Sequence, residues 1–199
     1  MLKSHITLSA LVVLVAGSFQ LLAQSAPPPT IRPMVTVNGV PDKNKITAGS
    51  NSPTMKVDSF GNAEEKDFIV RALGTLETGK EWKEYSFTFT PQKSGYLWMS
   101  LLGQYPAVAE ANKDLIQVDY DKISVTGGTL ENGDFETIEA SGKPKFWAYA
   151  KAILSVGSKS ALSGNRFVTA SSNSPIGVAL MGTAGQPVTV TLNARAHSE

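Results

Sequence analysis

The strongest constraint on how this chain folds is an alternation of apolar and polar side chains along short segments. In residues 83–91, KEYSFTFTP, the aromatic residues Tyr85, Phe87 and Phe89 alternate with serine and threonine. Successive side chains of a β-strand point to opposite faces, so a period of two predicts a strand with one buried face. Pro91 has no backbone N–H group and ends the ladder of hydrogen bonds.

Strand patterns recur along the rest of the chain, and only residues 107–114 carry a weak helical pattern. Many short strands separated by turn residues are typical of sandwiches and barrels. The sequence therefore predicts an all-β fold, an antiparallel β-sandwich or jelly roll that forms a single domain over residues 35–196. The further strand segments are residues 34–40, 67–73, 95–103, 115–125, 146–156, 165–171, 176–181 and 187–196.

Three of these segments allow predictions about which side chains face inward. Residues 95–103, GYLWMSLLG, are apolar on both faces, which predicts a central strand covered on both sides. In residues 115–125 the apolar positions change parity, and a bulge near Asp121 and Lys122 would reconcile them. In residues 187–196 the side chains expected to face inward are Val188, Val190, Leu192 and Ala194.

Residues 1–25 are typical of a cleavable secretory signal. Lys3 precedes an apolar stretch at residues 6–22, and Ala23 and Ser25 place small side chains before a cut after Ser25. The alternative is an uncleaved membrane anchor, but the stretch is short for a span and is interrupted by glycine and polar residues. We expect a bacterial protein that is secreted or periplasmic and is not inserted in a membrane after cleavage.

The charge balance and the absence of cysteine exclude several kinds of partner and bond. Loss of the signal removes Lys3 and no acidic residue, which leaves 17 basic and 17 acidic side chains. Without a basic stripe, nucleic acid is not an expected partner. The chain has no cysteine, so no disulfide framework stabilises it. Residues 26–34 are rich in proline and are expected to form an extended lead into the domain.

Four motifs together resemble a known superfamily. They are NGDFE with KPKFW at residues 132–147, PVTVTLNARA at 187–196, W-x-x-Y-x-F-T-F-T-P at 82–91 and VDYDKISV at 118–125. The set is similar to the galactose-binding-like jelly rolls, which include many bacterial carbohydrate-binding modules. The resemblance implies a β-sandwich of this type.

The order of the motifs departs from that of the superfamily, because the closing strands come before the opening ones. Residues 35–126 carry the closing half and residues 131–195 carry the opening half. A circular permutation, with the old ends joined through residues 126–130, accounts for this order and is tolerated when the old ends are neighbours. The alternative is two incomplete tandem domains, which would complete their sheets with strands of other chains.

Side chains for the common forms of catalysis are scarce. The histidines are His5, which leaves with the signal, and His197 near the end of the chain. Catalysis by a serine or cysteine nucleophile commonly needs a histidine base, and only His197 is left for that role after the signal is removed. A glycosidase needs only two carboxylates, and Asp119, Asp121, Asp134 and Glu136 qualify by type alone. We expect a protein that is not an enzyme.

The resemblance implies one structural calcium ion between the opening and closing strands. In the related modules a carboxylate from each of these strands commonly holds the ion, which here implicates Glu136 and Asp121, with Asp134 or Asp119 as helpers. Calcium prefers six to eight oxygen ligands. Lys122 stands where the family often has a second aspartate, so the alternative is an ion-free edge with Glu136 paired to a lysine.

A sugar ligand would stack on exposed aromatic rings and bond to nearby polar groups. Trp82 and Trp147 fall where the superfamily has core tryptophans, and Trp98 lies in the segment that is apolar on both faces, so all three are expected in the core. The expected ligand-binding residues are the tyrosines and nearby polar residues Tyr96, Gln104, Tyr105, Asn112, Lys113 and Tyr149.

The first functional hypothesis is therefore an exported, non-catalytic module that binds a polysaccharide or a cell-surface glycan. The alternative is a structural protein of the envelope or matrix that self-associates by completing its sandwich with strands of a neighbouring chain. A fold resemblance alone does not decide between them.

Overall fold

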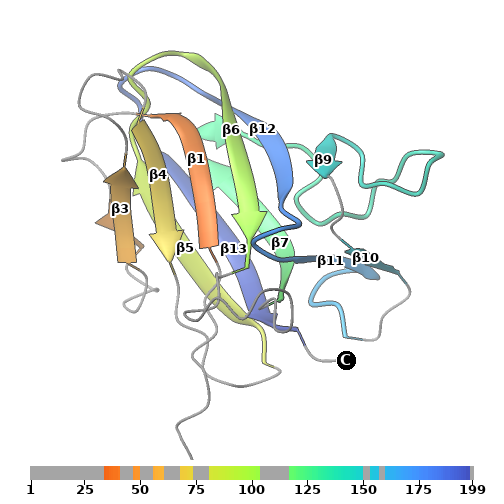
Figure 1. Ribbon diagram of the computed structural model, residues 1–199. Helices are drawn as coiled ribbons and strands as arrows, with labels where there is room; N and C mark the ends of the chain where they lie inside the picture. Colours follow the sequence, from red (N-terminus) through yellow and green to blue (C-terminus); the bar gives the residue numbers. More distant parts are fainter. Residues whose placement is uncertain are drawn as a thin grey trace, which may run out of the picture.

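Two antiparallel β-sheets pack face to face in the computed structural model (Figure 1), which describes residues 34–40, 47–49, 56–60, 68–73, 81–103, 117–149, 153–156 and 160–197. Every regular element in these residues is a strand, which confirms the predicted all-β sandwich. None of the described residues form a helix long and apolar enough to cross a bilayer. Residues 1–33 and the weak helical pattern at 107–114 lie outside the described part of the chain.

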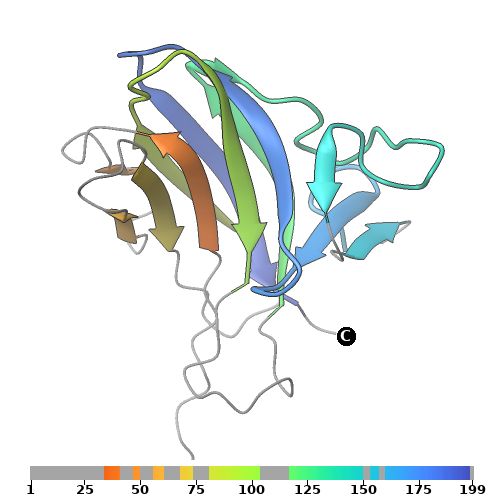
Figure 2. The ribbon, with the colours of Figure 1, turned by 45° about the horizontal axis from the view of Figure 1, so that its top comes forward.

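The first sheet has seven strands, and β6 (Gly95–Leu102) lies at its centre between β1 (Met34–Val40) and β12 (Ile176–Gly182). Figure 2 shows β6 and β12 side by side along the front layer. The far edge of β12 is shared by two short strands, since one pairs with residues 176–178 and the other with residues 181–182. The remaining strands are β3 (Lys56–Phe60), β4 (Phe68–Leu73), β8 (Gly128–Thr129) and β9 (Trp147–Tyr149).

The second sheet has six strands, and β13 (Val188–Ala196) lies between β7 (Val118–Thr126) and β5 (Lys83–Phe89). On one side β7 continues to β11 (Arg166–Ala170) and then to β10 (Ile153–Val156). On the other side β5 pairs with the two-residue strand β2 (Thr47–Ala48).

Strands from both halves of the chain occur in both sheets. In the first sheet β12 of the opening half pairs with β6 of the closing half, and in the second sheet β13 lies between β7 and β5. The halves therefore share their sheets within a single chain. The circular permutation that we infer from the motif order stays a prediction.

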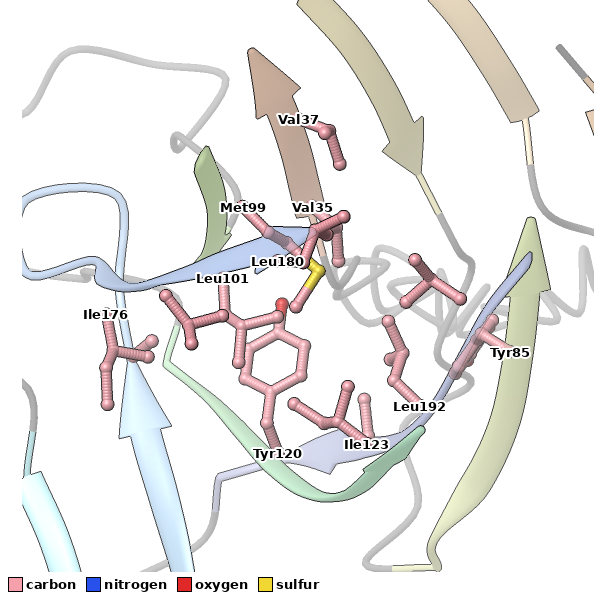
Figure 3. Close-up of a cluster of buried hydrophobic side chains, with 14 of the residues drawn as sticks. Val35, Val37, Tyr85, Met99, Leu101, Tyr120, Ile123, Ile176, Leu180 and Leu192 are labelled. Carbon is pink, nitrogen blue, oxygen red and sulfur yellow. The ribbon is translucent and has the colours of Figure 1, made fainter. Parts of the chain in front are cut away.

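The core lies between the inner faces of the two sheets, as the alternation predicted. Tyr85, Phe87 and Phe89 of β5 are completely buried, and so are the four residues of β13 expected to face inward. Figure 3 shows side chains from both sheets meeting in this layer. Each buried aliphatic or aromatic side chain contributes about 1.5–3 kcal/mol relative to an exposed one.

A bulge in β7 lets both parities of this strand reach the core. Pairing with β13 shifts register between Thr191 and Asn193, which are opposite Ser124 and Asp121. Lys122 lies within the shift and has a left-handed backbone with φ of 48°. As a result Tyr120 and Ile123 both point inward, which confirms the predicted bulge near Asp121 and Lys122.

Tyr120 joins the two sheets through its hydroxyl group. Its ring crosses the core from β7, as Figure 3 shows, and the side chain is fully buried. The hydroxyl oxygen accepts the N–H group of Met34 at 3.0 Å and the hydroxyl donates to the carbonyl of Leu102. One side chain thereby ties the start of β1 and the end of β6 to the opposite sheet. Burial raises the pKa of Tyr120, so the phenol stays protonated.

Tyr120→Phe is expected to lower the free energy of unfolding by about 1–3 kcal/mol, because the Met34 N–H and the Leu102 carbonyl lose their partner inside the sandwich. Urea denaturation followed by tryptophan fluorescence measures the change. Tyr96→Phe removes an exposed hydroxyl from the same fold and should change stability by less than about 0.5 kcal/mol. Equal stability of Tyr120→Phe and the wild type would show that the hydroxyl does not hold the sheets together.

Candidate functional site

The outer face of the first sheet exposes two aromatic rings on one strand. Along β6, Leu97, Met99 and Leu101 are buried, and the residues between them point away from the core. Tyr96 is 76% exposed and Trp98 is 42% exposed. Residues two apart on a strand share a face and lie about 7 Å apart along it. The two rings are therefore neighbours on an open surface.

The expectation that Trp98 belongs to the core was wrong. Segment 95–103 does form a central strand of its sheet, but only its inner face is covered, since Tyr96 and Trp98 remain exposed. A strand that is apolar on both faces has both faces covered only where another layer of protein packs against each of them. The position of Trp147 in the core is confirmed, because it is 5% exposed and its Nε1 donates to the carbonyl of Asn132 at 2.9 Å.

The Trp98 ring leans across the neighbouring strand β12 and covers Gly177. A β-carbon at residue 177 would lie 2.4 Å from Cζ2 of Trp98 and 2.6 Å from Cε2, far inside van der Waals contact. Gly177 is buried although it lies on the outer side of β12. Ala179 and Met181, the next outward residues of β12, pair with Trp98 and Tyr96 respectively and are both exposed.

This part of the face carries no charge. The sequences of β6, GYLWMSLL, and β12, IGVALMG, contain no acidic or basic residue. The polar groups on the outward side of β6 are the hydroxyls of Tyr96 and Ser100 and the indole N–H of Trp98, all of them neutral. Two rings, short aliphatic side chains and neutral hydroxyls make a surface suited to an uncharged ligand with apolar faces and hydroxyl groups.

Most of the predicted ligand-binding residues cannot be placed around these rings. Tyr96 is exposed, as a ligand-binding residue must be. Tyr149 belongs to β9 at the edge of the same sheet, and its side chain lies outside the described part of the structure. Gln104, Tyr105, Asn112 and Lys113 also lie outside the described residues. Their roles stay predictions.

Asp121 and Glu136, the carboxylates expected at a metal, lie close together and hold one loop. Oδ2 of Asp121 accepts the backbone N–H groups of Leu162 and Ser163 at 2.8 and 2.9 Å. Oε1 of Glu136 accepts the N–H groups of Asn165 and Arg166, both at 2.8 Å. The loop that precedes β11 is thus wrapped around two carboxylates.

The hydrogen bonds at this place do not fit a calcium ion. Calcium needs oxygen ligands, but Oε2 of Glu136 faces Nη1 of Arg166 at 2.8 Å, and Oδ1 of Asp121 accepts the N–H of Lys122 at 2.6 Å. The carboxylates therefore face N–H donors and a guanidinium group. Asp134 is exposed, and its Oδ1 lies 3.3 Å from the backbone nitrogen of Glu136. In the described part of the chain, no three histidine or acidic side chains surround a point that could hold a metal. Calcium remains only what the resemblance implies.

A second buried carboxylate, Asp119, is the centre of a polar network that the sequence patterns did not reveal. Its oxygens lie 2.9 Å from Nε of Arg195, 2.7 Å from Nδ1 of His197 and 2.7 Å from the hydroxyl of Thr169. The network joins β7, β11 and the end of β13, and it accounts for Asp119 without a metal ion.

The half-buried Trp82 packs on the guanidinium of this network. The central carbon of the Arg195 guanidinium lies 4.4 Å from the centroid of the Trp82 ring and 4.9 Å from that of Phe167. Nε1 of Trp82 donates to the carbonyl of Ser160 at 2.9 Å. Cation–π contact of this kind stabilises a partly desolvated arginine. The Trp82 ring therefore packs against the protein's own side chains, whereas the Trp98 ring is exposed on the sheet.

Comparison with known proteins gives no relative: no protein-family model, no curated protein and no solved structure matches the chain. The resemblance to galactose-binding-like jelly rolls therefore depends on the motifs alone. The observed sandwich is compatible with it, but many unrelated functions share this architecture.

Asp121→Asn is expected to change how stability depends on pH. Burial, and then the nearby charge of Glu136, raise the pKa of Asp121. The folded protein therefore keeps this proton to higher pH than the unfolded chain, in which aspartate has its usual pKa of about 4. The contribution of Asp121 to stability consequently falls as the pH rises from the unfolded pKa to the folded one.

Urea denaturation of both proteins at several pH values from about 3 to about 7 measures this difference. The free energy of unfolding of the wild type should fall relative to that of Asp121→Asn across the interval. Asp134→Asn is the control: it removes an exposed carboxylate near Glu136 and leaves the Asp121 carboxylate and its N–H partners in place, so the trend of the wild type should persist in it. A difference between wild type and Asp121→Asn that is flat or rises with pH would contradict the assignment.

Proposed function

We propose that this chain is an exported, non-catalytic β-sandwich that binds a polysaccharide or a cell-surface glycan on the outer face of its first sheet. The observation that carries the proposal is the pair of exposed rings, Tyr96 and Trp98, beside two neighbouring strands, β6 and β12, that have no charged residue. An exposed tryptophan beside an exposed tyrosine is uncommon on a surface that binds nothing, because both rings then expose apolar area to water.

The chemistry of the face suits sugar rings. The C–H bonds on the faces of a pyranose pack on aromatic rings, and its hydroxyl groups bond to neutral polar side chains. Tyr96 supplies both a ring and a hydroxyl, Trp98 supplies the larger ring, and the hydroxyl of Ser100 lies on the same side of β6. A rigid sheet holds these groups in fixed positions, so binding costs little ordering entropy.

Two features of the sequence agree with this proposal. The signal-like residues 1–25 would bring the protein to a compartment where polysaccharides and surface glycans are found. The motifs in both halves resemble a superfamily rich in carbohydrate-binding modules. Neither feature identifies the ligand, and both are independent of the position of the two rings.

Trp98→Ala is expected to weaken retention on the polysaccharide that the protein binds by at least about tenfold, because truncating a ring at the centre of a contact costs about 1.4 kcal/mol or more. Tyr96→Ala should weaken it to a smaller extent. Affinity electrophoresis through gels that contain single polysaccharides measures both. Phe146→Ala is the matched control, since Phe146 is also exposed but belongs to the loop before β9.

Two outcomes would overturn the proposal. If no polysaccharide in a broad panel slows the wild type, glycan binding fails. If Trp98→Ala is slowed as much as the wild type, the ligand binds elsewhere.

Sedimentation velocity of the wild type and of Trp98→Ala over a hundredfold concentration range tests the rival use of the face, as a contact with a second copy. A wild type that grows with concentration beside a variant that stays monomeric would favour self-association.

A further inference from the structure

The backbone conformation at residue 177 does not require a glycine. Gly177 lies inside β12 between two buried residues, Ile176 and Val178, and it pairs with both β6 and β9. Its φ angle is outside the left-handed region, where glycine is favoured. Glycine weakens a strand interior because it has no side chain to pack, so its presence there often marks a close approach by another group.

The group that approaches Gly177 is the Trp98 ring. A β-carbon at residue 177 would lie 2.4, 2.6 and 2.8 Å from three consecutive atoms of the indole, Cζ2, Cε2 and Nε1, and no backbone atom is among these nearest contacts. Any larger residue would therefore push the ring away from β12 and leave the strand in place. The absence of a side chain at residue 177 therefore gives the Trp98 ring the room to lean across β12.

We propose that Gly177 is a positioning residue of the ligand face, which lays Trp98 across β12 so that it receives an uncharged pyranose ring. This inference rests on the proposed function and names the chemical class of its ligand. Gly177 has no side chain to touch a ligand, so it acts only through the ring that covers it.

The class of ligand follows from the charge of the face. β6 and β12 have no charged residue, and the outward residues of β12 beside the rings are Ala179, which pairs with Trp98, and Met181, which pairs with Tyr96. A glycan with carboxylate or sulfate groups would lose hydration on these two strands, and neither strand has a cation to pair with it. A neutral glycan loses only hydroxyl hydration where its C–H faces meet the rings. The face therefore favours neutral polysaccharides over acidic ones.

The experiment combines a measurement of the ring with a measurement of binding. Acrylamide quenching of tryptophan emission, compared with Trp98→Phe to isolate the Trp98 contribution, reports the exposure of the ring without any ligand. In Gly177→Ala we expect stronger quenching of Trp98 and an unfolding midpoint close to that of the wild type. Affinity electrophoresis uses hydroxyethylcellulose, galactomannan and laminarin as neutral probes, and alginate and polygalacturonate as acidic ones.

We expect Gly177→Ala to bind the retained neutral polysaccharide about tenfold more weakly than the wild type. A double-mutant cycle provides the control: if Gly177 acts only through Trp98, then adding Gly177→Ala to Trp98→Ala should cause no further loss. Further loss in the double variant would show that residue 177 acts on its own.

The outcomes separate this inference from the proposed function. Unchanged quenching and unchanged binding in Gly177→Ala would overturn the positioning role while glycan binding stands. Retention by the acidic probes in preference to the neutral ones would overturn the ligand class. Retention by no probe would remove the proposed function and the ligand class with it, and the quenching result would then still decide whether Gly177 sets the orientation of Trp98.

Discussion

The burial of one face of β6 determines what the opposite face presents. Three side chains of β6 pack in the core between the two sheets, namely Leu97, Met99 and Leu101. Because successive side chains of a strand alternate, Tyr96 and Trp98 then point outward. A slip of one residue in the register between β6 and its neighbours would bury the two rings and expose the aliphatic residues. The core therefore fixes the candidate ligand face, and the rings need no support from a flexible loop.

Polar groups hold the parts of the sandwich that the apolar core does not reach. The Tyr120 hydroxyl ties β7 to β1 and β6, and the Asp119 network holds the end of β13. Asp121 and Glu136 hold the loop before β11 through its N–H groups. In each case a buried or half-buried oxygen accepts hydrogen bonds from backbone or guanidinium donors, which satisfies groups that would otherwise destabilise the fold. The carboxylates thus have a structural role that needs no cation.

Much of the fold followed from the sequence because alternation reports burial directly. It predicted the strands around Phe87 and Leu192 and the bulge beside Lys122. It failed for Trp98, because a strand that is apolar on both faces looks the same whether its second face is covered by protein or kept for a ligand. The missing signal was Gly177, which pairs with Ser100 of β6, and a local sequence pattern does not reveal a pairing between positions so far apart in the chain. The network of Asp119 was hidden for the same reason.

The most direct test of this account is to observe the three tryptophan indole N–H signals by proton–nitrogen correlation spectroscopy while a soluble neutral oligosaccharide is added. The indoles of Trp82 and Trp147 donate to backbone carbonyl groups of the protein itself, whereas Trp98 is exposed on the sheet. The account predicts that the Trp98 signal shifts with saturation and that the other two stay in place. Shifts confined to Trp82 or Trp147, or no shift with any neutral oligosaccharide, would contradict it.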